Sequence, residues 1–358
     1  MTDISTPRPA VQTDLTGKTI LVTGGAGFIG SHVVAALLAQ GARVINIDNF
    51  NDFYDPAIKR ANVLPFLQVP DGRYEQYEVN LCDEAAMQDV FEHHGRTIDR
   101  VVHLAAWAGV RPSMQYPVRY HHANVTGTTL LLELMKAHDI GRLVFASSSS
   151  VYGACQEAPF VEDQDTTKPV SVYAATKRMG ELLLHTYAHL WGLQSVSLRF
   201  FTVYGPAQRP DLAIHKFTHR LFNNLPIPVY GDGSAERDFT YIDDIVQGVL
   251  AALVYDQTPY EIVNLGESQR ISVKALIERL EALTGKTATI DWQPPVPGDV
   301  PMTCANIDKA RRLLGYNPTV PLDVGLPRFV EWYRRFHGGD NGLDRPLNLG
   351  AITAATSN

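Results

Sequence analysis

The feature that most constrains the fold is a regular alternation between short apolar runs and longer amphipathic stretches, which begins at Lys18. Helical spacing is seen at 29–40, 118–138 and 172–191. The apolar runs are 19–23, 43–47, 100–104, 142–146, 194–200 and 261–265. Strands that alternate with helices pair in parallel and are covered on both faces. The pattern therefore predicts an α/β fold with a doubly wound parallel sheet.

The chain changes character after Tyr204, where prolines become frequent and break it into short elements. They include Pro206, Pro210, Pro226, Pro228, Pro294, Pro295, Pro297 and Pro301. We expect a Rossmann-type sheet domain over 17–205 plus 239–268, and a smaller C-terminal α/β domain that binds substrate over 206–238 plus 269–335. Residues 1–16 and 338–358 lack periodicity, which predicts a disordered N-terminal tail and a flexible C-terminal tail.

The composition excludes several classes of function. The formal net charge is −7 and the pI is about 5.9, which argues against a nucleic-acid binder. No run of about 18 uncharged apolar residues is present, so we expect no membrane span. The cysteines Cys82, Cys155 and Cys304 are widely separated, and neither they nor the histidines have metal-ligand spacing. We expect a metal-free cytoplasmic protein.

A glycine-rich loop follows the first predicted strand and opens the first predicted helix. Its sequence is Gly-Gly-Ala-Gly-Phe-Ile-Gly over 24–30. Glycines allow a tight turn and a close approach of the backbone to a diphosphate, and the helix N-terminus favours the negative charge. The predicted contacts with a dinucleotide are Gly24, Gly27, Phe28, Ile29 and Gly30.

Asp48 ends the second predicted strand, 18 residues after Gly30. A carboxylate there accepts hydrogen bonds from the hydroxyls of the adenosine ribose and repels a 2′-phosphate, so NAD is favoured over NADP. The alternative is that Asp48 caps a loop. Asn49 is predicted beside it. Asn80 and Leu81 follow another short strand and border the adenine in this interpretation, although a plain loop role explains them as well.

Tyr173 and Lys177 lie four residues apart on a predicted helix and so project from one face. A serine-rich run, 147–150, follows a buried strand upstream and brings hydroxyls to the same edge of the sheet. An ammonium beside a phenol favours the phenolate, so we expect Lys177 to lower the pKa of Tyr173. Tyr173 would then act as a base near neutral pH.

With the glycine loop and the serine run, the Tyr-x-x-x-Lys pair resembles the extended short-chain dehydrogenase/reductase family, over about Lys18 to Trp332. Several segments are similar to the UDP-glucuronate 4-epimerase group within it. They are 47–56 (IDNFNDFYDP), 108–111 (AGVR), 147–153 (SSSSVYG), 199–206 (RFFTVYGP) and 297–301 (PGDVP). The chain departs from that group at Val296 and at 179–181 (MGE), which we expect to touch the nucleotide and dimer surfaces.

The resemblance implies a reaction and a role for each matching residue. Tyr173 removes the proton of the sugar C4 hydroxyl, Ser148 hydrogen-bonds the same oxygen, and Lys177 holds the nicotinamide ribose. Hydride passes to NAD, the 4-keto sugar rotates, and hydride returns to its opposite face. Asn124 orders the loop or helix beside the site, unless it is simply a buried structural residue. Further cofactor contacts are expected at Leu104, Ala105 and Ala106.

The resemblance also implies a cage for a uronate carboxylate, formed by the neutral donors Ser149, Ser150 and Thr202. Because a 4-keto uronate is a β-keto acid, we expect this cage to prevent decarboxylation. Four other residues are predicted to contact the nucleotide sugar. Arg209 and Arg237 suit the diphosphate, Asp299 the nucleotide ribose and Arg111 the sugar side. Surface ion pairs are the alternative for Arg111, Arg209 and Asp299.

Other activities on the same scaffold are the nearest alternatives. A 4,6-dehydratase or a UDP-glucuronate decarboxylase needs an acid beside the catalytic hydroxyl, where this chain has Ser149 and Ser150. A UDP-glucose or UDP-N-acetylglucosamine 4-epimerase remains the main alternative. A non-catalytic NAD-sensing module is another, but such a protein would not need Tyr173. The resemblance implies a homodimer through helices 118–138 and 172–191, although core burial explains their apolar residues equally well.

Overall fold

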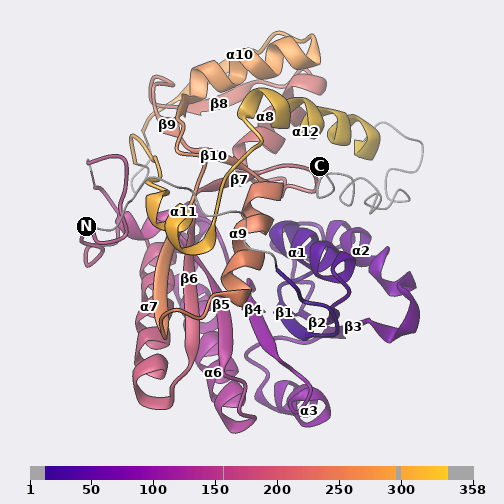
Figure 1. Cartoon of the computed structure of the whole chain (residues 1–358). Coiled ribbons are helices and arrows are strands. Elements are labelled where there is room, and N and C mark those ends of the chain that lie inside the picture. The colour runs from indigo at the N-terminus through magenta and orange to yellow at the C-terminus, as the bar shows by residue number, and fades with distance from the viewer. Residues whose placement is uncertain (1–12, 156, 296–299, 338–358) are drawn as a thin grey trace.

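The computed structural model describes residues 13–155, 157–295 and 300–337, and within them a seven-stranded parallel sheet forms the centre of the molecule (Figure 1). The strand order is β11-β6-β5-β4-β1-β2-β3. The strands are β1 (Thr19–Thr23), β2 (Arg43–Asp48), β3 (Tyr74–Glu78), β4 (Arg100–His103), β5 (Arg142–Ser148), β6 (Gln194–Phe200) and β11 (Tyr260–Leu265). The strands β2 and β3 are added on one side of β1, and the chain then crosses to the other side of β1 to form β4. In such a sheet a crevice opens at this switch point, between β1 and β4.

Alternating apolar residues of the strands bury both faces of the sheet. Ile20 and Val22 belong to one core cluster and Leu21 to the other, because neighbouring residues of a strand point to opposite faces. The first cluster packs against α1 (Phe28–Ala39) and α9 (Ile242–Val254). The second packs against α3 (Glu84–His94), α6 (Gly127–Ala137) and α7 (Val172–Trp191). The predicted doubly wound α/β fold is confirmed.

The smaller C-terminal region lies at one end of the sheet, at the top of Figure 1. At its border, two short strands of the larger region pair, β7 (Thr202–Tyr204) with β10 (Phe239–Tyr241). Within the smaller region, β8 (Ile227–Tyr230) pairs with β13 (Ile290–Gln293) and β9 (Glu236–Arg237) with β12 (Ile271–Ser272). Its helices are α8 (Ala213–Phe222), α10 (Val273–Thr284), α11 (Asp308–Leu314) and α12 (Leu322–His337). The remaining helical segments are α2 (Pro56–Val63), α4 (Val110–Gln115), α5 (Pro117–His121), and the 3-10 turns Phe66–Gln68, Pro70–Gly72 and Ser149–Tyr152.

One buried carboxylate joins the two regions. Asp238 accepts hydrogen bonds from the backbone N–H groups of Glu267 (2.9 Å), Ser268 (3.0 Å) and Ala305 (2.9 Å). Burial raises the pKa of Asp238 to about 6, against the effect of these donors. Glu267 lies beside it with one buried carboxylate oxygen that has no hydrogen-bond partner. The two chain crossings at 238–239 and 268–269 therefore meet at a single side chain.

The predicted elements differ from the observed ones in several places. The helix expected over 118–138 contains a π-helical turn, His122–Thr126, between α5 and α6. Leu15, expected in the disordered tail, is fully buried because it packs into the first core cluster. Residues 1–12, the tail 338–358 and Asp299 lie outside the described residues. In the part of the chain that the structure describes, no helix is long and apolar enough to cross a membrane.

Candidate active site

A cavity of about 1050 Å³ opens at the carboxyl ends of the parallel strands. Its walls come from the segments that follow β1 through β6, and from α8, β8 and β9 of the smaller region. This is the crevice where doubly wound sheets bind their ligands. The volume lies just above the usual range for one small ligand, so there is room for a dinucleotide and a second molecule.

The glycine loop has the shape that a dinucleotide requires. Gly24 has a φ of +74°, and a Cβ atom there would lie 2.7 Å from the backbone nitrogen of Ala105. A Cβ atom at Gly30 would lie 2.1 Å from the carbonyl oxygen of Gly24. Gly27 is the N-cap of α1, and no side chain caps that helix end. Gly24, Gly27, Phe28, Ile29 and Gly30 all line the cavity, so the loop fits a diphosphate at the helix N-terminus.

Asp48 lines the cavity at the end of β2 and is only 7% exposed. It accepts hydrogen bonds from the backbone N–H groups of Ala26 (3.2 Å) and Phe50 (2.9 Å), so it also orders the neighbouring loops. Burial raises its pKa, and the ammonium of Lys59, 4.0 Å away, opposes that effect. Sequence reasoning missed Lys59, because its approach to Asp48 depends on how α2 folds back over the strand.

The other predicted cofactor residues divide into two groups. Asn49, Asn80, Leu81, Leu104, Ala105 and Ala106 line the cavity. Asn80 also accepts a hydrogen bond from the backbone of Cys82 (3.0 Å), which is the local turn role left open by the sequence. Asn124 is buried in the π-helical turn and is not part of the cavity lining.

Asn124 ties the loop after β4 to helix α7. Its Oδ1 accepts from the backbone nitrogen of Trp107 (2.7 Å), and its Nδ2 donates to the carbonyl oxygen of Trp107 (2.9 Å) and to the hydroxyl of Thr176 (3.0 Å). Thr176 is the residue before Lys177. These contacts favour the loop-ordering role over direct contact with the cofactor.

Helix α7 holds the end of β5 through one stripe of side chains. It begins after Ser171, whose hydroxyl accepts a hydrogen bond from the backbone nitrogen of Ala174 (3.1 Å). Tyr173 hydrogen-bonds Ser148, and Lys177 Nζ donates to the carbonyl oxygen of Ala146 (2.7 Å). One turn further on, Glu181 accepts from the Ser147 hydroxyl (2.6 Å). Residues four apart on α7 thus fix three successive residues of the strand.

The Glu181 carboxylate forms a buried ion pair with Arg199 of β6. Two donor–acceptor distances of 2.8 and 3.0 Å make the pair bidentate, and both side chains are almost completely buried. Burial alone would raise the pKa of Glu181, but the hydrogen bond and charge of Arg199 lower it. Sequence reasoning missed this pair.

Gly180, the residue before Glu181, lies against the ring of Phe145, where a Cβ atom would come within 2.4 Å. Gly180 is therefore a core position and not the dimer-surface change that we expected.

The expected lowering of the pKa of Tyr173 by Lys177 is wrong for the protein alone. Burial raises the pKa of Tyr173, while the hydrogen bond with Ser148 and the charge of Arg209 act in the opposite direction. Burial also lowers the pKa of Lys177 to about 7. The Lys177 ammonium lies 5.9 Å from the centroid of the Tyr173 ring and donates to the backbone, so it is not directed at the phenol oxygen.

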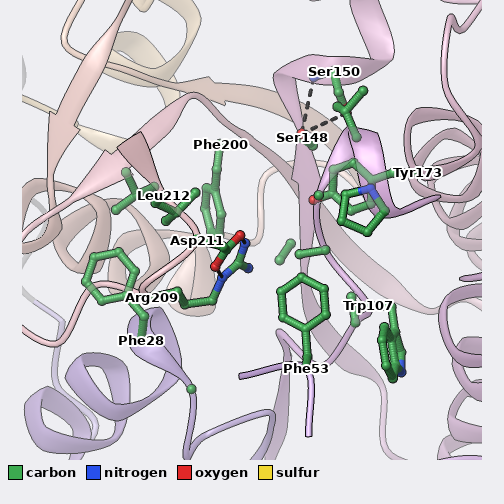
Figure 2. A pocket seen from close by; sticks show the side chains of 18 of the residues that line it. Phe28, Phe53, Trp107, Ser148, Ser150, Tyr173, Phe200, Arg209, Asp211 and Leu212 are labelled. Atoms are coloured by element: carbon green, nitrogen blue, oxygen red, sulfur yellow. Dashed lines mark hydrogen bonds and ion pairs between the residues drawn. The ribbon is translucent and has the colours of Figure 1, made fainter. Parts of the chain in front are cut away.

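The predicted hydroxyl groups surround Tyr173. Ser148, Ser149, Ser150 and Thr202 line the cavity with it. The hydroxyl and the backbone nitrogen of Ser150 both donate to Ser148 Oγ, at 2.9 and 3.2 Å. Ser148 Oγ thereby accepts two hydrogen bonds, which leaves its own proton to donate toward Tyr173 or a ligand. Figure 2 shows Ser148, Ser150 and Tyr173 together on one side of the pocket.

Arg209 lies nearer to the reacting group than we expected. It forms a bidentate pair with Asp211, at 2.8 and 2.9 Å, and the two lie across the pocket from Ser148 in Figure 2. Its charge acts on both Tyr173 and Tyr54, so it lies within electrostatic reach of the reacting group, and its role at the substrate diphosphate stays a prediction.

The other cations reach the cavity from separate elements. Arg111 of α4 stacks on the ring of Tyr230, with 3.9 Å from the guanidinium carbon to the ring centroid, and Arg237 lies on β9. Both line the cavity. Lys216 of α8 also lines it and was missed by sequence reasoning. Burial and the charges of Arg220 and Arg111 lower its pKa, which indicates a region that favours an anion.

The fold and the site together define a Rossmann-type enzyme of the short-chain dehydrogenase/reductase class. A dinucleotide cradle and a Tyr/Lys pair share one cavity with a region of positive charge. The model for the NAD dependent epimerase/dehydratase family matches residues 20–266, and the chain belongs to that family. The predicted family is confirmed, and so is NAD as the cofactor.

Three known proteins illustrate the similarity. A UDP-glucuronate 4-epimerase of Thermodesulfobacterium geofontis is 45% identical over 315 residues, which cover 87% of this chain and 95% of that protein. The crystal structure of the UDP-glucuronic acid 4-epimerase of Bacillus cereus, in complex with UDP-glucuronic acid and NAD, has a TM-score of 0.81 and 37% identity, covering 89% of this chain and 100% of that one. A UDP-glucose 4-epimerase of Thermotoga maritima, solved with UDP-glucose, has a TM-score of 0.79 and 33% identity, covering 88% and 99%.

Proposed function

We propose that the protein inverts C4 of a UDP-hexuronic acid and interconverts UDP-glucuronate and UDP-galacturonate. The observation that carries this proposal is the set of neutral hydroxyls at Ser149, Ser150 and Thr202, which line the same cavity as Tyr173 and Arg209. Neutral donors and one cation suit a carboxylate, and the position after Ser148 has no acid that would support dehydration. The named relatives support the same substrate.

In the proposed mechanism, Tyr173 and Ser148 act on the C4 oxygen. Bound NAD would supply the hydride acceptor for C4 and, once reduced, the hydride donor to the opposite face of the sugar. Tyr173 must enter the reaction as the phenolate, which the hydrogen bond of Ser148 and the charge of Arg209 favour and which the positive nicotinamide of bound NAD would favour further. The phenolate oxygen takes the proton of the C4 hydroxyl as the C4–H bond breaks, and it returns that proton when the bond re-forms. Ser148 donates to the C4 oxygen in both directions, because Ser150 fills its acceptor positions. Lys177 and Asp48 are assigned to the two riboses of the cofactor, and Arg237 and Lys216 to the substrate diphosphate.

The 4-keto sugar formed from a hexuronic acid is a β-keto acid, so it loses carbon dioxide when its carboxylate turns perpendicular to the carbonyl plane. Hydrogen bonds from Ser149 and Thr202 would hold the carboxylate out of that orientation while the sugar rotates, and Ser150, whose hydroxyl proton is donated to Ser148 Oγ, would fix the neighbouring end of the cage. The Glu181–Arg199 pair supports this role, since it anchors Ser147 immediately before the serine cage.

The proposal is tested by incubating the purified protein separately with UDP-glucuronate, UDP-glucose and UDP-N-acetylglucosamine. Proton NMR of the anomeric and C4 signals follows inversion in each sample. We expect turnover of the uronate and little of the neutral sugars. If the protein epimerises UDP-glucose but leaves the uronate unchanged, the carboxylate cage is the wrong interpretation and a neutral-sugar epimerase is the right one.

We also propose that the protein is a cytoplasmic homodimer in which 17–205 plus 239–268 and 206–238 plus 269–335 form two domains. Helices 118–138 and 172–191 would form the interface. Large apolar side chains that are 41–80% exposed on α5 and α7 support this, at Val118, Met179, Leu182, Leu190 and Trp191. Light scattering of the native protein and of Leu182→Glu tests the interface, and a monomeric native protein would contradict it.

A further inference from the structure

The segment that follows Asp48 forms a wall of the cavity and carries no role in the reaction described above. Asn49 Oδ1 accepts from the backbone nitrogen of Asn51 (3.2 Å), and Asn51 Oδ1 accepts from that of Phe53 (3.1 Å). These two turns fold 49–54 over the end of β2. The segment also includes the next residue, Tyr54, which lines the cavity.

Phe53 anchors this wall between two other segments. Its ring lies edge-on to Trp107 at 5.4 Å between centroids, and the Arg209 guanidinium lies 5.3 Å from its centroid. Figure 2 shows Phe53 between Arg209 and Trp107. The wall therefore contacts both the loop after β4 and the smaller region, and it spans the middle of the cavity.

Tyr54 presents an unusual hydroxyl at this place. Its oxygen is buried without a hydrogen-bond partner in the protein, and of the side-chain atoms with that property among the described residues it is the one whose residue lines the cavity. The Tyr54 hydroxyl oxygen lies 4.0 Å from the point that a Cβ atom at Gly27, the N-cap of α1, would occupy. A buried hydroxyl without a partner is costly, and such groups need an explanation.

The surroundings of that hydroxyl favour a phosphate. It lies at the uncapped N-terminus of α1, where an anion is stabilised by the helix dipole and backbone N–H groups. The Lys59 ammonium lies 5.0 Å from the centroid of the Tyr54 ring, and Arg209 also acts on the phenol. Burial raises the pKa of Tyr54 well above its ordinary value, so the phenol keeps its proton and remains a donor.

We propose that the Tyr54 hydroxyl donates a hydrogen bond to the diphosphate of bound NAD, and that the segment 49–54 thereby retains the cofactor between the two hydride transfers. This inference rests on NAD binding and not on the identity of the sugar. In this proposal the phenol adds one side-chain donor to the backbone N–H groups of the glycine loop.

The test compares Tyr54→Phe with Tyr204→Phe. Tyr204 is a matched control, because its hydroxyl is also buried without a partner but its residue does not line the cavity. NAD is removed from each protein, and its Kd is measured by calorimetry. We expect Tyr54→Phe to weaken NAD binding about tenfold, the size expected for a hydrogen bond to a charged group, and Tyr204→Phe to leave it unchanged.

A second readout separates this role from a structural one. If the hydroxyl serves the cofactor, removing it relieves an unsatisfied group in the NAD-free protein, so the Tm of NAD-free Tyr54→Phe should equal or exceed that of the wild type while NAD affinity falls. Wild-type NAD affinity in Tyr54→Phe, or an equal loss in Tyr204→Phe, would overturn the proposal. So would weaker binding of UDP with unchanged NAD affinity, since the hydroxyl would then serve the substrate.

Discussion

The cofactor half and the substrate half of the cavity are built in different ways. In the cofactor half, the backbone of one continuous segment, 24–30, makes the diphosphate cradle, and Asp48 follows it at the end of the next strand. In the substrate half, side chains do the work, and they come from elements as distant as Arg111 of α4 and Arg237 of β9. A site made of contiguous backbone is fixed when the sheet forms, whereas a site made of scattered side chains depends on how two regions pack.

The electrostatics of the two halves also differ. The buried carboxylate of Asp48 has the Lys59 ammonium 4.0 Å away, which partly balances its charge. On the substrate side, Lys216 is close enough to Arg111 and Arg220 for their charges to lower its pKa. A balanced site suits a cofactor that stays bound, and a cationic site suits an anionic substrate that must be attracted and released. The comparison leads to four predictions.

The largest effect is expected at Tyr173, which serves the chemistry and not the binding of either ligand. Tyr173→Phe should reduce turnover by about 10³-fold, because it removes the group that transfers the C4 proton. NAD content, measured after denaturation and extraction, should stay at the wild-type level. A variant that also loses NAD would show that the two halves are not independent.

Lys216→Met should raise KM for the UDP-sugar about tenfold, because one charge-assisted contact with the diphosphate is lost. NAD affinity should not change in Lys216→Met, whereas Tyr54→Phe is expected to weaken NAD binding. Arg220→Met is the matched control, since Arg220 lies one turn further along α8 and does not line the cavity. Equal KM values for the two variants would contradict the assignment of Lys216.

Thr202→Ala should release UDP-pentose during turnover of UDP-glucuronate, because the carboxylate of the 4-keto sugar gains freedom to rotate. The product ratio is measured by anion-exchange chromatography. Thr202→Ser keeps the hydroxyl and should restore clean epimerisation. If Thr202→Ala forms no pentose, the hydroxyl cage does not control decarboxylation.

The smallest effect is expected at Glu267, at the junction of the regions. Burial, followed by the charges of Asp244 and Asp238, raises its pKa from 4.5 to about 7. A carboxyl with a raised folded pKa stabilises the fold fully below about pH 4.5, and this contribution is lost as the pH rises toward 7. Glu267→Gln cannot titrate, so its free energy of unfolding relative to wild type should increase by about 1 kcal/mol from pH 4.5 to 8, after a discount for solvent screening.

Urea unfolding of both proteins at several pH values measures that difference. Glu278→Gln on the exposed face of α10 is the control and should show no comparable trend. A pH-independent difference for Glu267→Gln would mean that the junction carries no electrostatic strain.

The features of the site that depend only on short stretches of sequence could be predicted. The glycine loop, Asp48 and the Tyr173/Lys177 stripe were predictable, because strand–turn–helix chemistry and the helical repeat fix their placement. The bidentate pair of Glu181 and Arg199 was not, since it joins α7 to β6 through contacts that exist only after packing.

The same limit applies to burial and electrostatics. No local sequence pattern marks Lys59 or Lys216, because the groups around them are brought together only by the tertiary fold. The sign of the pKa shift of Tyr173 was wrong for this reason, because a spacing of four residues predicts proximity but not desolvation.

The carboxylate of Asp238 has a consequence for recombination between related genes. It belongs to the last residue of 206–238, and it binds the backbone of Ser268, the last residue of 239–268. Two of the three chain crossings between the regions, at 238–239 and 268–269, therefore fall within one hydrogen-bonded cluster around Asp238 in any chimera that exchanges the smaller region; the third crossing, at 205–206, lies outside it. An exchange that takes both of these junctions from the same parent keeps the hydrogen-bonded cluster intact. A chimera that takes these two junctions from different parents should fold only if the Asp238 carboxylate can still accept its three backbone hydrogen bonds.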